Sequence, residues 1–305
     1  MGSDRYNKPT PRPTSAISDR SKSERLHANI IGKEAFLSSI LKVEIARILN
    51  SKYRLMSKFP EKPFQQNSFA SLSAQSADDH QSERLYAQRQ ADLAIRFNKQ
   101  YQSAAFELPE EVEAMPIFQE WVAGTLTQKI TSPFWEIAQP QKNQRCLDIG
   151  CGVSFLIYPW REWGAFFCGQ DISSVARDAL ISRGPQVNSK LFKGVELGTA
   201  RQLRYDDAQF DLAIATGWSC YYSLDYWQGA IKEVKRVLLP HSSFVFDVLN
   251  PEKPLALDWA VLETELGAEV FLEPLADWEK LIKSAGGKIN KQLSGELFEL
   301  YKVTF

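Results

Sequence analysis

A short apolar run that ends in an acid and then turns through two glycines constrains this chain more than any other segment. The run at 145–149 (RCLDI) predicts a strand, and Gly150-Cys151-Gly152 follows it just before a predicted helix that begins near Ser154. Glycine is needed where φ is positive or where the backbone must approach a ligand closely. Because open α/β sheets bind ligands at the carboxyl ends of their strands, the sequence predicts a ligand site at this turn.

From residue 145 onwards, short apolar strands alternate with helical stretches. Five strands are expected near 145–149, 165–171, 189–195, 210–215 and 243–249. The helices between and after them are expected near 154–162, 173–183, 225–237 and 275–285. This alternation predicts an α/β fold with a doubly wound, mostly parallel sheet. Two last strands near 287–293 and 297–304 are joined by so few residues that they must pair as an antiparallel hairpin, which completes a seven-stranded sheet.

The part before the sheet is expected to be helical and partly disordered. Residues 1–82 predict a largely disordered extension with one amphipathic helix at 34–49, whose flanking bases would allow weak contact with a membrane or a partner. Packing of this helix on its own protein is the simpler interpretation, and Met56 is an alternative start. Residues 83–140 predict a helical cap with a lid at 108–138, and residues 141–305 the main domain.

Composition excludes several classes of function. The chain has 36 basic and 37 acidic side chains, so its net charge of −1 argues against a nucleic-acid partner. Its four Cys form no C-x-x-C pair and its three His are scattered, so no metal site is expected. No apolar run approaches the roughly 18 residues that cross a bilayer, and no secretory signal is evident. We therefore expect a cytoplasmic protein without a transmembrane segment.

A second acid narrows the ligand class. Phe155 stands where a dinucleotide fingerprint would have its third glycine. Asp171 lies 23 residues beyond Asp148 at the predicted end of the next strand, where an acid can bind both hydroxyls of a ribose. Two acids at strand ends and a glycine turn fit a cationic adenosine ligand without phosphate. A nicotinamide dehydrogenase remains a minor alternative.

These motifs resemble the class I S-adenosylmethionine-dependent methyltransferases, of the methyltransferase-11/25 type. The resemblance rests on four segments in order: LDIGCG at 147–152, GQDIS at 169–173, LRYDDAQFDLAIA at 203–215 and EVKRVLLPHSSFVFDV at 233–248. It implies S-adenosyl-L-methionine as cofactor, S-adenosyl-L-homocysteine as product, and methyl transfer by in-line displacement. The alternative is a protein that binds this cofactor as a regulator or scaffold without transferring methyl.

The resemblance also assigns roles to residues. Asp148 would face the ammonium of the cofactor, Gly150 and Gly152 would let the backbone pack against its methionyl chain, Asp171 would bind the ribose, and Ile172 would pack on the adenine. The other cofactor contacts it implies are Cys151, Thr199, Ala200 and Thr216. Two positions depart from the family pattern: Ser154 replaces a third glycine, and Thr199 stands where an acid often contacts the adenine amino group.

The acceptor is expected beside the loop at 216–222. The loop lacks the Asn/Asp-Pro-Pro-aromatic motif of enzymes that methylate nucleic-acid bases or glutamine, which favours a small-molecule acceptor. A base is needed only if the acceptor atom carries a proton. The candidates for that base are Tyr221, Tyr222, Asp225 and Asp247, and the candidates for the substrate pocket are Trp121, Trp218 and Tyr221. Alkylation of Cys151 or Cys220 is expected to inhibit, because these thiols fall in the glycine loop and the acceptor loop.

Overall fold

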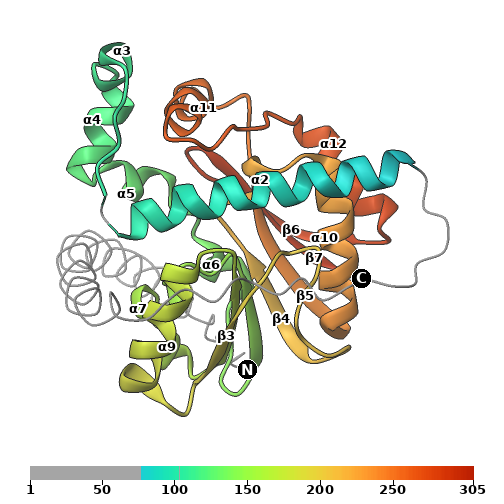
Figure 1. Cartoon of the computed structure of the whole chain (residues 1–305). Coiled ribbons are helices and arrows are strands. Elements are labelled where there is room, and N and C mark those ends of the chain that lie inside the picture. Colours follow the sequence, from blue (N-terminus) through green and yellow to red (C-terminus); the bar gives the residue numbers. More distant parts are fainter. Residues whose placement is uncertain (1–76, 103) are drawn as a thin grey trace, which may run out of the picture.

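The computed structural model describes residues 77–102 and 104–305, and within them seven strands form one sheet (Figure 1). The strand order is β3-β2-β1-β4-β5-β7-β6. Strands β1 to β5 pair in parallel, and β7 pairs antiparallel with both β5 and β6. The doubly wound sheet with an antiparallel C-terminal hairpin is therefore confirmed. The predicted helix at 34–49 and the alternative start at Met56 lie outside the described residues.

The strands fall close to their expected positions, except that the fifth begins five residues earlier than expected, at Leu238. They are β1 (Arg145–Ile149), β2 (Phe166–Asp171), β3 (Phe192–Leu197), β4 (Phe210–Ala215), β5 (Leu238–Leu249), β6 (Lys288–Ser294) and β7 (Phe298–Thr304). Strand β3 begins three residues later than expected, because helix α9 (Ser174–Asn188) continues through Pro185. A Cβ at Gly184 would overlap the ring of Phe192, so this helix packs directly on the strand that follows it.

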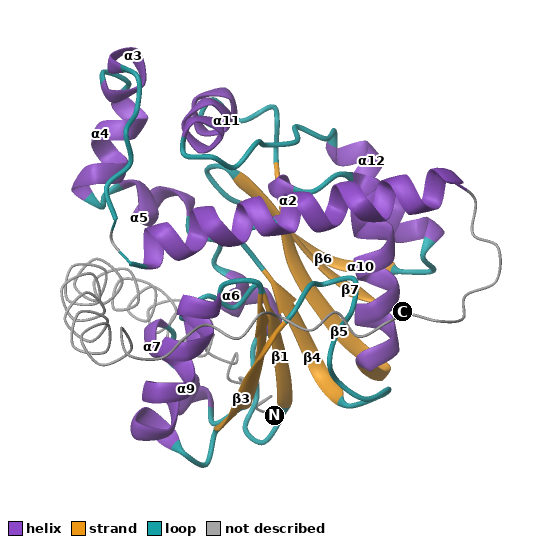
Figure 2. Ribbon diagram, viewed as in Figure 1, coloured by secondary structure: helices purple, strands orange, loops and turns teal. Residues whose placement is uncertain are grey.

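Helices cover both faces of the sheet (Figure 2). One face packs against α10 (Leu224–Val237) and α12 (Leu275–Ser284), and the other against α9 and three short helices. The short helices are α6 (Phe134–Ala138), α7 (Ser154–Ile157) and α8 (Trp160–Trp163). Pro159 separates α7 from α8 where the sequence predicted one helix, because proline cannot donate the amide that a continuous helix needs.

Alternate residues of the central strands face the two cores, as the period of a strand requires. On β5, Phe244 and Phe246 belong to the core beneath α10, whereas Val245 belongs to the core beneath α6. Phe134 and Trp135 of α6 are buried in the second core. This end of the predicted lid is therefore part of the domain core.

A long helix crosses above the sheet. Helix α2 (Ala77–Tyr101) begins six residues before the predicted start of the helical cap, and Figure 1 shows it running across the molecule. It is followed by α3 (Glu110–Glu113), α4 (Pro116–Ala123) and α5 (Leu126–Ile130). Helix α11 (Ala256–Glu265), which the sequence did not predict, packs against α3 and α4. These helices enclose the space above the carboxyl ends of the strands.

Candidate active site

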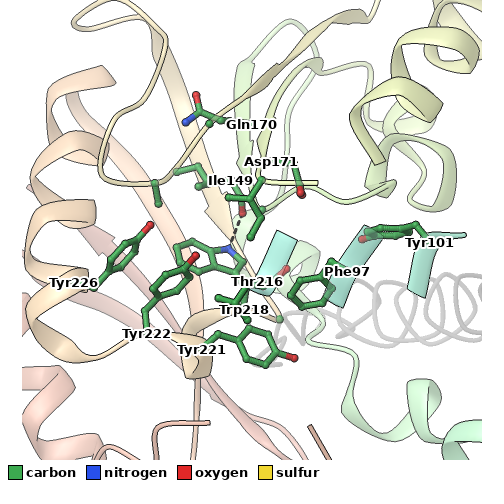
Figure 3. Close-up of a pocket in the computed structure, with 16 residues that line it drawn as sticks. Phe97, Tyr101, Ile149, Gln170, Asp171, Thr216, Trp218, Tyr221, Tyr222 and Tyr226 are labelled. Carbon is green, nitrogen blue, oxygen red and sulfur yellow. Dashed lines mark hydrogen bonds between the residues drawn. The ribbon is translucent and has the colours of Figure 1, made fainter. Parts of the chain in front are cut away.

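A cleft opens at the carboxyl ends of β1, β2 and β4, beneath α2 (Figure 3). We call it the central cleft. The glycine loop and the end of β2 form one wall, with Gly150, Asp171 and Ile172. Helix α2 contributes Phe97 and Tyr101, which Figure 3 shows on the side of the cleft away from Tyr222 and Tyr226. The other lining residues are Leu93, Ile149, Gln170, Gly198, Ala200, Thr216, Gly217, Trp218, Tyr221, Tyr222 and Tyr226.

The glycine loop needs its glycines for two separate reasons. Gly150 and Gly152 have φ of 68° and 48°, in the left-handed region that side chains with a Cβ disfavour. In addition, a Cβ at Gly150 would overlap the indole of Trp218, and one at Gly152 would overlap the hydroxyl of Tyr101. The amide of Gly150 donates to the carbonyl of Gln170 at 2.8 Å, which joins the loop to β2. Both the backbone conformation and the close aromatic contacts therefore require glycine.

The two acids predicted to face the ligand lie in different environments. Asp171 lines the central cleft and accepts hydrogen bonds from the amides of Gly152 at 2.6 Å and Ser173 at 2.7 Å. Asp148 lies behind the loop, where its carboxylate accepts a hydrogen bond from the hydroxyl of Ser154. Burial raises the pKa of Asp148 to about 7 and also raises the pKa of Asp171. The structure therefore places Asp171 in the cleft wall and Asp148 just beneath it.

Of the remaining residues predicted to contact the cofactor, some line the central cleft and others lie outside it. Ile172, Ala200 and Thr216 line the central cleft, whereas Cys151, Gly152 and Thr199 do not. The hydroxyl of Thr199 forms a hydrogen bond with the hydroxyl of Tyr226 at 2.9 Å, so it is held by the protein itself.

The expected sensitivity to thiol alkylation does not agree with this geometry. Cys151 and Cys220 are both buried. Burial raises the pKa of each thiol well above its usual range, so the reactive thiolate is scarce. Their places in the sequence alone did not indicate that they are shielded from solvent.

Aromatic side chains form the wall of the central cleft at the β4 loop. The indole N–H of Trp218 donates to the carbonyl of Ile149 at 2.8 Å, which Figure 3 shows as a dashed line. Its ring stacks on Trp227 with centroids 4.4 Å apart, and Tyr222 stacks on Tyr226 at 3.8 Å. Trp227 is fully buried. The cluster therefore joins a packed core to the open cleft.

A second cavity adjoins the central cleft, and we call it the side cavity. The two share Phe97, Thr216, Gly217 and Tyr221. Six of the other residues around the side cavity are apolar or aromatic: Trp121, Leu126, Ile130, Tyr158, Trp259 and Phe298. Its remaining lining residues are polar: Arg96, Gln100, Thr127, Thr131, Ser132, Asp247 and Glu263. The predicted lid at 108–138 thus contributes to the side cavity, while α2 covers the central cleft.

Two buried carboxyl groups line the side cavity. Glu263 accepts two hydrogen bonds from the guanidinium of Arg96, at 3.0 and 2.8 Å, and one from the hydroxyl of Tyr221 at 2.9 Å. Asp247 accepts hydrogen bonds from the hydroxyl of Ser132 and from the amide of Gly217, the latter at 2.8 and 3.0 Å. Burial raises the pKa of Asp247 to about 7. The carboxyl of Glu263 has a cationic partner, and that of Asp247 has neutral donors.

The structure separates the candidates for a base. Tyr221 borders both cavities, but its hydroxyl donates to Glu263 and burial raises its pKa well above the usual range. Tyr222 lines the central cleft only and its pKa is raised by burial in the same way. Asp225 is exposed in the first turn of α10 and lines neither cavity, so its proposed role as a base is wrong. An acid at that position instead favours the positive end of the helix dipole.

Several residues of the site were not singled out from the sequence. Arg96 and Phe97 come from α2, whose pattern of apolar residues is weak, and Glu263 comes from the unpredicted α11. Ser132 reaches Asp247 across 115 positions of sequence. One available signal was the position of Arg96 between the apolar residues Leu93 and Phe97, which indicates a charge on a buried face.

Within the described part of the chain, no group of three or more His, Cys, Asp or Glu side chains could hold a metal ion. No helix there is both long enough and apolar enough to cross a membrane.

Comparison with known proteins agrees with the motifs and the fold. Residues 147–246 match the family model of a methyltransferase domain. The chain is 30% identical over 115 residues to sterol 4-C-methyltransferase strm-1 of Caenorhabditis elegans, covering 36% of this chain and 32% of the relative. The chain thus spans about a third of the length of the curated relative it matches.

A solved structure of another protein shares this fold. Geranyl diphosphate C-methyltransferase from Streptomyces coelicolor superposes with a TM-score of 0.53 at 12% identity, over 71% of this chain and 97% of that one. Magnesium protoporphyrin IX methyltransferase from Synechocystis gives a TM-score of 0.48 at 15% identity, over 71% and 99%. The match over residues 147–246 and the fold shared with the geranyl diphosphate enzyme agree with a class I S-adenosylmethionine-dependent methyltransferase domain.

Proposed function

We propose that this chain transfers a methyl group from S-adenosylmethionine to a small, largely apolar acceptor that occupies the side cavity. The observation that carries the proposal is the junction of the two cavities at Thr216 and Gly217, with Phe97 and Tyr221 across it. A methyl donor in one cavity and an acceptor in the other would meet at this junction. Alignment of the two reactants in this way supplies much of the rate of a displacement reaction.

The residues of the central cleft fit the cofactor. Asp171 is a carboxylate in the cleft wall that could accept from the ribose hydroxyls, and Ile172 offers an apolar surface for the adenine. Asp148, beneath the loop, favours a cation above it. The cofactor supplies an activated methyl group on a positively charged sulfur, and the aromatic rings of Phe97, Tyr221 and Trp218 around the cleft favour such a cation.

The side cavity supports a small acceptor with an apolar body. Trp121, Trp259 and Phe298 supply aromatic surface, and the polar side chains between them could orient an acceptor. The name of one similar protein, a sterol 4-C-methyltransferase, refers to an acceptor with an apolar body. A net charge of −1 gives no support to a nucleic-acid acceptor.

The proposal is tested with the full chain and S-adenosylmethionine labelled in its methyl group. Calorimetry first measures binding of S-adenosylhomocysteine, and a small-molecule extract then serves as the source of acceptor. Transfer of label into a small molecule is the expected result. Binding without transfer to any small molecule would contradict the proposal and favour a regulator or scaffold that only binds the cofactor.

A further inference from the structure

The carboxyl of Asp247 lies where the two cavities meet. Asp247 is fully buried at the carboxyl-end half of β5 and lines the side cavity. Both of its oxygens accept from the amide of Gly217, which borders both cavities. The hydroxyl of Ser132 donates to the same carboxyl from the segment between α5 and α6. These donors hold the carboxyl beside the junction that the proposed methyl transfer uses.

The two acids of the side cavity differ in how their charge is balanced. Glu263 forms a buried ion pair with Arg96 and accepts a further hydrogen bond from Tyr221. Within residues 77–102 and 104–305, no basic side chain forms an ion pair with Asp247. A buried carboxylate without a cation is costly, and a packed core would not need one. The absence of a cationic partner therefore points to a functional role for the Asp247 carboxyl that the Glu263 carboxyl does not have.

We propose that Asp247 is a catalytic residue that takes the proton lost by the acceptor, and that the acceptor carries no negative charge and has a proton on the atom that is methylated. The proposal rests on the proposed function of the two cavities. The acceptor atom forms a bond to the methyl carbon while the bond between that carbon and sulfur breaks. The electron pair of the broken bond stays on sulfur. The acceptor's own proton passes to Asp247, which becomes a neutral carboxylic acid.

Charge in the side cavity leads to the same class of acceptor. The charges of Arg96 and Glu263 cancel, because these two side chains form an ion pair. Ionisation of Asp247 therefore gives the acidic and basic side chains that line the cavity one net negative charge. A carboxylate or phosphate acceptor would place a like charge beside it in a site of low dielectric. Such an acceptor also has no proton to give on the atom that would be methylated. Hydroxyl and amine acceptors meet both conditions.

The first experiment separates acceptors by charge and uses the unaltered chain. A small-molecule extract is divided on ion exchangers at neutral pH into neutral, cationic and anionic fractions, and each is incubated with the enzyme and methyl-labelled S-adenosylmethionine. Label is expected in the neutral or cationic fraction. Label confined to the anionic fraction would overturn this inference and leave methyl transfer itself intact. Absence of label from every fraction would overturn both the proposed function and the inference that rests on it.

The second experiment uses Asp247→Asn, whose amide has the shape of the carboxyl and can still bond to Gly217 and Ser132. Single-turnover transfer to the labelled fraction is expected to fall by about 100-fold or more, within the range for loss of a general base. Affinity for S-adenosylhomocysteine should stay within about threefold, since the central cleft is unchanged. Ser132→Ala, which keeps the carboxyl and removes one donor, should lose less than about tenfold. A transfer rate in Asp247→Asn within threefold of the unaltered chain would overturn the role of Asp247.

Discussion

The guanidinium of Arg96 donates to both carboxylate oxygens of Glu263, at 3.0 and 2.8 Å, and so joins α2 to α11 across the side cavity. Both side chains are almost fully buried, with relative exposures of 3% and 2%. Tyr221 adds a third hydrogen bond and connects the pair to the loop between the two cavities. This buried ion pair therefore helps to hold α2 over the site, together with the more exposed pair of Arg89 and Glu269.

Removal of one partner of this pair should destabilise the fold strongly. We expect Arg96→Met to lower the free energy of unfolding by about 3–5 kcal/mol, because it leaves the Glu263 carboxyl buried without its cation. Urea unfolding measures the change. The double variant Arg96→Met with Glu263→Leu should recover most of the loss, since two apolar side chains then fill the site.

The exposed pair between Arg89 and Glu269 provides a matched control on the same helix. Glu269→Gln should cost about 1 kcal/mol or less, because an exposed ion pair is screened by solvent. A loss in Arg96→Met as small as that in Glu269→Gln would show that the buried pair does not hold α2 in place.

Substitution of Asp171 should weaken cofactor binding. Asp171→Ala removes the carboxylate of the central cleft and the two hydrogen bonds that it accepts from Gly152 and Ser173. We expect the affinity for S-adenosylhomocysteine to fall by about tenfold or more, the size of effect that loss of charged hydrogen bonds produces. Calorimetry gives the affinity, and Asp178→Ala, an exposed acid of α9, should leave it unchanged. Equal affinities in the two variants would refute the role of Asp171 at the ribose.

A methyl group added to the glycine loop should lower the free energy of unfolding by more than backbone strain alone would. Gly150→Ala forces alanine into a left-handed conformation, at about 1–2 kcal/mol, and overlaps the indole of Trp218. Gly124→Ala is the matched control, because its φ of 75° is similar and no atom lies near the added carbon. Gly150→Ala should therefore lose more stability in urea unfolding and also lose cofactor affinity. Equal losses of stability in both variants would argue against the contact with Trp218.

Cofactor affinity should rise with pH across neutrality. The carboxyl of Asp148 has a pKa of about 7 because burial and the nearby Asp171 raise it, against a hydrogen bond from Ser154 that lowers it. Below this pKa the group is mostly neutral, and a cationic ligand favours its ionised form. Affinity for S-adenosylhomocysteine should therefore increase from pH 6 to pH 8, by up to about tenfold per unit on the acid side, and then level off.

Substitution of this carboxyl provides the check on that pH dependence. Asp148→Asn should bind more weakly at pH 8 and lose most of the rise in affinity, as followed by calorimetry at a series of pH values. Asp225→Asn changes an exposed acid that lines neither cavity and should keep the full rise. A rise that persists in Asp148→Asn would assign the titration to another group.

The parts of the site that the sequence predicted well are those built from neighbouring residues. The strand at 145–149, its glycine turn and the acid at the end of the next strand are local patterns, and the structure brings Gly150, Asp171 and Ile172 into one cleft wall. Residues that were assigned to the site only because they are near it in sequence do not all lie in the two cavities. Asp225 follows Tyr222 by three positions, yet it faces solvent on α10.

Sequence alone determined the alternation of strands and helices, the antiparallel hairpin and the glycine loop, because period, turn chemistry and positive φ act over a few residues. Only the tertiary structure decided which helix covers the loop and which acids share the side cavity. Arg96 and Glu263 are 167 positions apart, and Ser132 and Asp247 are 115 apart. Their pairing depends on how α2, α11 and the segment before α6 pack, and the burial that raises the pKa of Asp247 arises only from that packing.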